Sequence, residues 1–262
     1  MAGTVRRVLV LVGGSPHAHD FGAVGRVLVD IARTEGHDVT LVDHPDAAAE
    51  SLWAPDPIGR PELLVVHGLW WRMDGPAYDR WRPDHGYTTS PEWRDAVSDH
   101  VAGGGPLLAL HTAPICFDDW PEWGNIVGGA WQWGISSHPP LGPVTAMVVD
   151  GHPVTAGLPP ELRLRDEVYG DLAVRDGIDV LLRARRHPDD DLQPIGWVHR
   201  FGRGRVVYDG LGHDARSLTD PAHRRLITQA MGWLLETGGR LPTGQKSSGA
   251  SRSNEEGSVA ES

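Results

Sequence analysis

The stretch VRRVLVLVGGSP at residues 5–16 decides the fold class. Its uninterrupted run of Val and Leu ends at two glycines, which predicts a buried strand of a parallel sheet over residues 5–12. Apolar residues at helical spacing follow over residues 21–35, and Gly36 ends that helix. A second strand is expected at residues 39–42, so the order strand–helix–strand predicts βαβ units around a parallel sheet.

The same alternation continues to about Gly142, after which the pattern changes. The first part adds a strand at residues 61–67, a helix capped by Ser90, a strand at residues 106–110 and a helix at residues 119–127. The second part has short strand candidates separated by turn signals, at residues 144–149, 162–165, 180–184, 194–199 and 205–208. A last helix is expected at residues 221–236 with Asp220 as its cap. We therefore predict a mostly parallel α/β sheet with an antiparallel C-terminal extension.

Composition favours one domain. The chain has 262 residues, of which 40% are hydrophobic, enough for one substantial core. We expect this domain to span residues 1–240. Residues 241–262 are rich in Ser, Gly and Glu and poor in apolar residues, which predicts a disordered tail.

Charge and cysteine content exclude several classes of protein. The net charge of −11 opposes nucleic-acid binding, because the chain would repel phosphates. A single cysteine, Cys116, excludes an internal disulfide framework. No apolar run reaches the roughly 20 residues of a membrane helix, and the N-terminal run is too short for a signal peptide. The first strand lacks a G-x-G-x-x-G motif, so no nucleotide is expected, and we predict a cytoplasmic protein.

The chain is rich in tryptophan, with 11 Trp against 3 Phe and 4 Tyr. Indole rings stack on the flat faces of sugars, so this excess favours a carbohydrate partner, although Trp also fills protein cores. The pairs that we expect to form a sugar-stacking wall are Trp70 with Trp71 and Trp131 with Trp133.

Histidines follow several predicted strands, where α/β sheets carry their sites. His19, His67, His111 and His213 occupy such positions, with Glu167 and His138 in later loops. Histidine is a common metal ligand and a common general base near neutral pH. The metal-ligand candidates are His19, His67, His111 and His138. Most other histidines, including His223, are expected on the surface or in loops.

His111 ends an apolar strand on a strand-to-loop elbow. Class I amidotransferases and related hydrolases place a Cys or Ser nucleophile on such a turn. Cys116 comes several residues later, after a proline, so it is not expected to be that nucleophile.

Seven motifs occur in a fixed order between residues 5 and 238: HAHDF (17–21), GGGPLLALHTA (103–113), WPEWGNIVGG (120–129), SSHP (136–139), DGHPVTAGLP (150–159), DEVYG (166–170) and PIGWVHRFGRGRVVYDGLGHD (194–214). In this set the chain resembles the ThuA-like (trehalose utilisation) family. The resemblance implies a flavodoxin-like, class I glutamine amidotransferase-like three-layer fold without the Cys nucleophile. It also implies catabolism of disaccharide-derived keto-sugars beside an NAD-dependent sugar oxidoreductase, a divalent metal such as zinc, and a homodimer.

On this basis we expect isomerase, epimerase or lyase chemistry on a sugar carbonyl that the metal polarises. Glu167, His213 and His111 are the catalytic candidates, and Asp214 is placed next to them as a substrate-binding residue. Two alternatives remain open. One is a non-catalytic sugar-binding or regulatory module with the same pocket. The other is a metal-dependent glycoside hydrolase, ranked lower because Asp166 and Glu167 are adjacent and cannot flank a glycosidic bond.

Overall fold

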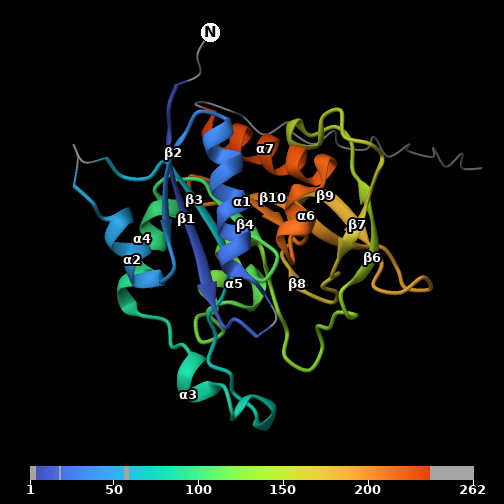
Figure 1. Cartoon of the computed structure of the whole chain (residues 1–262), viewed down its shortest axis with the longest axis horizontal. Helices are drawn as coiled ribbons and strands as arrows, with labels where there is room; N and C mark the ends of the chain where they lie inside the picture. The colour runs from blue at the N-terminus through green and yellow to red at the C-terminus, as the bar shows by residue number, and fades with distance from the viewer. Residues whose placement is uncertain (1–3, 18, 56–58, 237–262) are drawn as a thin grey trace, which may run out of the picture.

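The computed structural model describes residues 4–17, 19–55 and 59–236. The predicted tail lies outside these residues. Within them, the fold is built on one nine-stranded sheet in the order β2-β1-β3-β4-β11-β10-β9-β6-β7 (Figure 1).

The first five strands of this order run parallel to one another. They are β2 (Asp38–Val42), β1 (Arg7–Gly14), β3 (Leu63–Leu69), β4 (Leu107–Leu110) and β11 (Gly204–Asp209). An order of 2-1-3-4-5 is that of flavodoxin-like doubly wound sheets, which bind ligands outside the carboxyl ends of their strands. The predicted parallel sheet is confirmed.

The other four strands pair antiparallel, as predicted for the second half of the chain. They are β10 (Gln193–Phe201), β9 (Asp179–Ala184), β6 (Gly142–Val148) and β7 (Glu161–Asp166). Strands β5 (Gly129–Ala130) and β8 (Ala173–Val174) form a separate two-stranded sheet.

Helices cover both faces of the sheet, so the fold has three layers. One face packs against α1 (Phe21–Thr34), α6 (Ala215–Thr219) and α7 (Pro221–Leu235), and the other against α2 (Pro45–Leu52), α4 (Pro91–Ala102) and α5 (Glu122–Val127). Successive side chains of β1 point to opposite faces of the sheet, so this strand contributes to the core on both faces. Val8 and Val10 face α1, while Leu9 and Leu11 face α2. The short helix α3 (Arg82–His85) lies away from the sheet (Figure 1), and the 3-10 turns are η1 (Pro76–Tyr78), η2 (Ala113–Ile115) and η3 (Pro153–Thr155).

Local sequence sets the helix starts. The side chains of Asp20, Ser90 and Asp220 accept backbone N–H groups in the first turns of α1, α4 and α7. A proline at the first helical position follows both Ser90 and Asp220. No helix among the described residues is both long and apolar enough to cross a bilayer.

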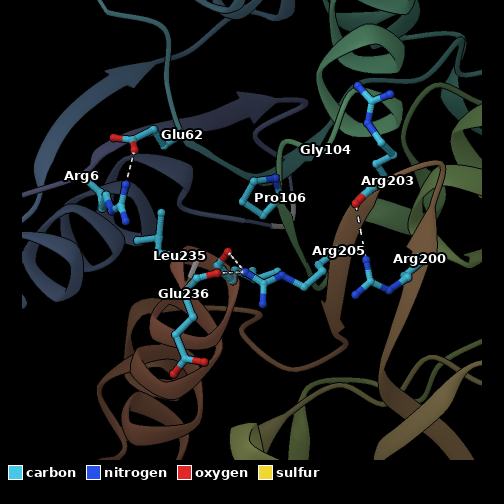
Figure 2. A pocket seen from close by; sticks show the side chains of 10 residues that line it. Arg6, Glu62, Gly104, Pro106, Arg200, Arg203, Arg205, Leu235 and Glu236 are labelled. Carbon is cyan, nitrogen blue, oxygen red and sulfur yellow. Dashed lines mark hydrogen bonds and ion pairs between the residues drawn. The ribbon is translucent and has the colours of Figure 1, made fainter. Parts of the chain in front are cut away.

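Arginines gather at the amino ends of the parallel strands around a hollow of about 500 Å³ (Figure 2). Arg205 donates to the carbonyl oxygens of Leu234, at 2.6 Å, and Glu236 at the end of α7. Arg203 donates at 2.9 Å to the carbonyl of Gly103, which follows α4. Cations stabilise the negative carboxyl ends of helices, so these arginines have a structural role. The hollow lies at the opposite end of the sheet from the histidines described next.

Candidate functional site

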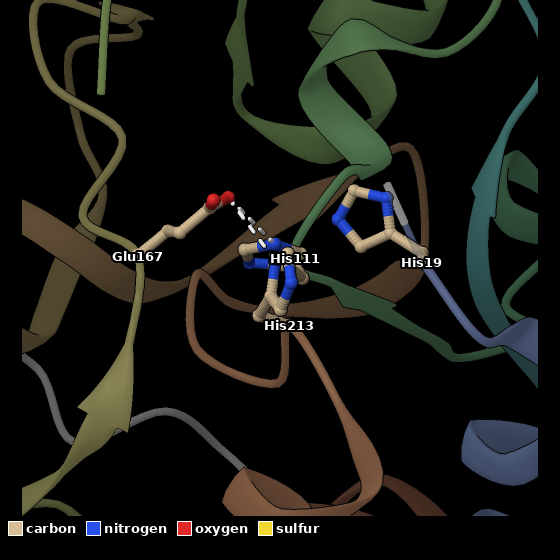
Figure 3. A group of neighbouring side chains, drawn as sticks. All are labelled: His19, His111, Glu167 and His213. Carbon is tan, nitrogen blue, oxygen red and sulfur yellow. Dashed lines mark ion pairs between the residues drawn. The ribbon is translucent and has the colours of Figure 1, made fainter. Parts of the chain in front are cut away.

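Five buried side chains meet at the carboxyl ends of the strands. His19 follows β1, His67 lies in β3, His111 follows β4 and His213 follows β11, while Glu167 follows the edge strand β7. Figure 3 shows Glu167 directed toward His111 and His213, with His19 on their other side. Separate strand ends therefore bring these five residues close to one another.

His111 lies on a strained elbow, as the sequence predicted. Its φ angle is +43°, in the left-handed region that few non-glycine residues adopt. Its Nδ1 lies 2.9 Å from the carbonyl oxygen of Gly210, to which it donates. That bond leaves Nε2 with the lone pair, 3.3 Å from the hydroxyl of Tyr169. Burial raises the pKa of Tyr169 well above its ordinary value. The phenol therefore stays protonated and donates a hydrogen bond to Nε2.

Glu167 and His213 form the polar centre of the group. The Glu167 Oε2 atom lies 3.2 Å from His213 Nδ1 and 3.7 Å from His111 Nε2. Burial acts to raise the pKa of Glu167, but the neighbouring imidazoles of His111 and His213 outweigh it and hold this pKa well below its ordinary value. Burial acts to lower the pKa of His213, but the Glu167 carboxylate outweighs it and the pKa is raised. Each of these two residues therefore favours the charged form of the other.

His19 has unused ligand capacity. Both of its ring nitrogens are buried without a hydrogen-bond partner. Burial and the neighbouring His111 and His67 lower the pKa of His19 to about 2, so the ring is neutral. A buried polar atom without a partner is costly, and a bound metal ion is one way to satisfy it.

Four side chains each offer one ligand atom, and these four atoms all lie within 4.8 Å of one another. They belong to His19, His111, Glu167 and His213. Three imidazoles with one carboxylate suit zinc and related divalent metals. His111 also has the carbonyl partner on its second nitrogen that metal-binding histidines usually have. The residues present therefore fit a divalent cation.

Two of the predicted metal ligands lie beside this group rather than in it. His67 donates from Nε2 to the carbonyl of Gly212 at 2.8 Å, and burial and the nearby His111 lower its pKa to about 3. His138 is partly exposed, and its Nδ1 lies 3.0 Å from the carbonyl of Pro139 and 3.6 Å from Glu167 Oε2.

An aromatic cavity of about 210 Å³ opens above the group, with His19 and Glu167 in its lining. The aromatic residues around it are Trp71, Tyr78, Trp81, Trp131, Trp133 and Tyr169. The rings of Trp71 and Trp133 stack with centroids 4.7 Å apart, and Trp133 is 49% exposed. This volume is below the roughly 300–1,000 Å³ of pockets for drug-sized ligands, which favours a single small ring as the occupant.

Comparison with known proteins identifies the family of the chain. The profile of the trehalose utilisation (ThuA) family matches residues 7–234. The chain belongs to the ThuA family. A ThuA-like protein from Parabacteroides merdae shares 20% identity over 88% of this chain and 90% of that one, with a TM-score of 0.68. A second, from Bacteroides uniformis, shares 17% over 90% and 94%, with a TM-score of 0.61. Membership of the ThuA family connects the chain to carbohydrate metabolism, and no curated protein matches it significantly.

Two predicted sugar-binding residues of this ThuA chain lie elsewhere. Trp70 is buried in the core, parallel to Phe117 at 6.1 Å, and does not line the aromatic cavity. Asp214 caps α6 by accepting the backbone N–H of Ser217 at 2.9 Å. Trp71, Trp131 and Trp133 do line the cavity.

Three residues of this region escaped the sequence reasoning. Tyr169 and Asp166 flank Glu167 in the motif DEVYG, and only the acidic pair gave any signal. His223 was expected on the surface, but it is fully buried and its Nε2 lies 2.9 Å from Asp209 Oδ2. The surface expectation was wrong because α7 packs this residue against the end of β11.

Cys116 is not a nucleophile on the elbow. Its buried Sγ lies 2.7 Å from the carbonyl oxygen of Gly68, and burial raises the pKa of its thiol to about 12. The reactive species of cysteine is the thiolate, which this environment suppresses. The elbow position is occupied by His111.

Proposed function

We propose that this ThuA chain is an enzyme of carbohydrate catabolism that isomerises, epimerises or cleaves a keto-sugar or keto-glycoside. One observation carries the proposal: four ligand atoms from separate strand ends lie within 4.8 Å of one another beside an aromatic cavity. Sugar rings stack on aromatic side chains, and carbonyl chemistry needs an electrophile and a proton-transfer group at one place.

In this proposal His19, His111, Glu167 and His213 hold a divalent metal such as zinc. When bound, the metal would act as a Lewis acid on a sugar carbonyl. The unpartnered ring nitrogens of His19 support this assignment, since burial keeps them neutral and available as ligands.

The chain's own residues would supply orientation and proton transfer. The exposed ring of Trp133 would stack on the sugar, and the neighbouring aromatic side chains would exclude water from the reacting carbon. Glu167 has a second carboxylate oxygen beyond the one in the ligand set, and this oxygen would accept a proton from the carbon next to the carbonyl. Tyr169 donates to His111 Nε2 in the structure and would turn toward a substrate oxygen once that nitrogen binds a metal.

The substrate's chemistry implies a partner reaction. A keto-sugar arises by oxidation of a sugar hydroxyl, so we propose that an NAD-dependent sugar oxidoreductase supplies it. We further propose a cytoplasmic location. We also propose a homodimer, and analytical ultracentrifugation would test this oligomeric state.

A second function has one observation in its favour. The Glu167 carboxylate already has a cationic partner in the absence of a metal when His213 is protonated, since its Oε2 lies 3.2 Å from His213 Nδ1. A non-catalytic sugar-binding module would use the same aromatic cavity and would bind sugars without converting them.

Metal content tests the proposal most directly. Gently purified wild type is expected to contain about one equivalent of a divalent metal by mass spectrometry, and His111→Ala is expected to lose it. His138→Ala is the matched control, because His138 contacts Glu167 but lies outside the four-donor group, and it should retain the metal. Wild type that stays metal-free after readdition would refute the metal assignment. Binding of keto-sugars without any product would then favour the binding module.

A further inference from the structure

The turn that carries His213 is held by side chains from other strands. Between β11 and α6, several of its backbone groups form hydrogen bonds with side chains. The carbonyls of Gly210 and Gly212 accept from His111 at 2.9 Å and from His67 at 2.8 Å. The N–H of Leu211 donates to Asp209 at 3.1 Å. The remaining two amides, of Gly212 and His213, donate to a single carboxylate.

That carboxylate is Asp166, which is 1% exposed. Its oxygens accept the backbone N–H of Gly212 at 2.8 Å, of His213 at 3.2 Å and of Glu167 at 2.8 Å. They also accept the hydroxyl of Ser217. Ionised carboxylates are seldom buried, and four donors compensate for the lost hydration.

The position of Asp166 in the sheet explains how its hydrogen bonds connect distant parts of the fold. Asp166 is the last residue of the edge strand β7, and three strands separate β7 from β11 in the sheet. Glu167 is therefore the one member of the four-donor group that comes from the antiparallel half of the sheet. The Asp166 carboxylate binds the amide of Glu167 and the amide of His213 at once, so it joins the two halves at this point.

We infer that Asp166 is a positioning residue: its carboxylate brings Glu167 and His213 together and so assembles the four-donor group. The Glu167 Oε2–His213 Nδ1 distance of 3.2 Å is the consequence. The inference rests on the proposed function only in taking this group as the metal-binding centre. Removal of the carboxylate's acceptor capacity is expected to separate the two residues without removing either.

The test compares Asp166→Asn with Ser217→Ala. Asparagine is nearly isosteric, but its amide nitrogen would face donors and cannot accept from them, so one or two of the bound N–H groups lose their acceptor. Ser217→Ala removes one donor and leaves the carboxylate with all three amides. In crystal structures, the Glu167 Oε2–His213 Nδ1 separation should exceed about 4 Å in Asp166→Asn, the usual limit for an ion pair, and stay near the wild-type value in Ser217→Ala.

Cobalt(II) affinity, followed by the absorption of the bound ion, gives a second readout. Loss of a residue that orients metal ligands typically weakens binding about 10–100-fold, and this is the effect expected for Asp166→Asn. Because Asp166 positions Glu167 as well as His213, the loss of cobalt affinity in the double variant Asp166→Asn/Glu167→Gln should be smaller than the sum of the two single effects. A purely structural role would instead give fully additive effects.

An unchanged Oε2–Nδ1 separation in Asp166→Asn would overturn the inference, as would cobalt affinity within about twofold of wild type. If wild type itself binds no cobalt, the metal assignment fails, and the crystallographic separation still decides the role of Asp166. If Asp166→Asn does not fold, Asp166→Glu replaces it, because the extra methylene displaces the same oxygens. A separation that stays at the wild-type value in Asp166→Glu would then overturn the inference.

Discussion

Removal of His223 should cost this protein a large part of its stability. The ring is fully buried, and its Nε2 lies 2.9 Å from Asp209 Oδ2, while its Nδ1 lies 2.9 Å from the carbonyl of Ser217. His223→Ala would leave the buried Asp209 carboxylate with the N–H of Leu211 as its remaining hydrogen bond from the described residues. Loss of one partner of a buried ion pair typically costs about 3–5 kcal/mol. At about 2–4 °C per kcal/mol, the melting temperature should fall by roughly 6–20 °C.

The size of this loss should depend on pH. Burial acts to lower the pKa of His223, but the Asp209 carboxylate outweighs it and the folded-state pKa is raised above 6.5. A raised pKa means that protonation stabilises the folded state, fully below about pH 6.5 and progressively less as pH rises through the folded pKa. Urea unfolding of wild type and His223→Ala, from pH 5.5 to 9, would measure the difference.

The control is Asp209→Asn/His223→Ala, which removes the unpaired charge and should recover part of the loss. A cost below about 1 kcal/mol at pH 6 would refute the reasoning, because it would mean that Asp209 is not left as an unpaired buried charge. A cost that does not change with pH would refute the assignment of the raised pKa.

Four further outcomes can be checked. Trp93→Ala should lose about 3–5 kcal/mol in urea unfolding, since Trp93 is a fully buried residue of α4, and a loss under about 1 kcal/mol would contradict that packing. Gly128→Ala should lower the melting temperature, because φ is +89° and a new Cβ would lie 2.7 Å from the His199 ring; an unchanged melt would show that the backbone can relax. Cys116 should resist iodoacetamide at pH 8 in the native protein and react once unfolded, and fast native labelling would argue against its buried, protonated thiol. Trp133→Ala should weaken sugar binding in calorimetry while changing stability by less than about 0.5 kcal/mol, and unaltered binding would remove Trp133 from the sugar-binding wall.

Most of the elements were predictable from local pattern. The strands and helices of the parallel half follow from apolar runs and caps, with ends displaced by a few residues; for example, α5 begins at Glu122 rather than 119. The helix α2 was missed, although its sequence contains helix-favouring alanines. Its start did have a signal, a proline at the first position after His44, whose side chain accepts the N–H of Asp46.

For the site, the sequence predicted only that candidate residues lie at the ends of strands, not which side chains point into it. Trp70 and Trp71 are neighbours in the sequence, but one is buried in the core and the other lines the cavity. The side chains of neighbouring residues in an extended chain point to opposite sides. The sequence therefore predicts that one of the two side chains is buried in the core, but it does not say which one. The same holds for Asp166, which holds the His213 turn, and Glu167, which joins the ligand group.

The sequence by itself determined the mostly parallel α/β sheet, its antiparallel half and the delivery of histidines to the carboxyl ends of strands, because these follow from short-range periodicity. Tertiary structure decided which four side chains share one ligand group. That selection depends on the path of the chain after each strand, and on a buried carboxylate at the end of β7 that binds a turn 46 residues away in the chain. Such a contact has no local signature, since its free energy comes from groups that meet only when the sheet is complete.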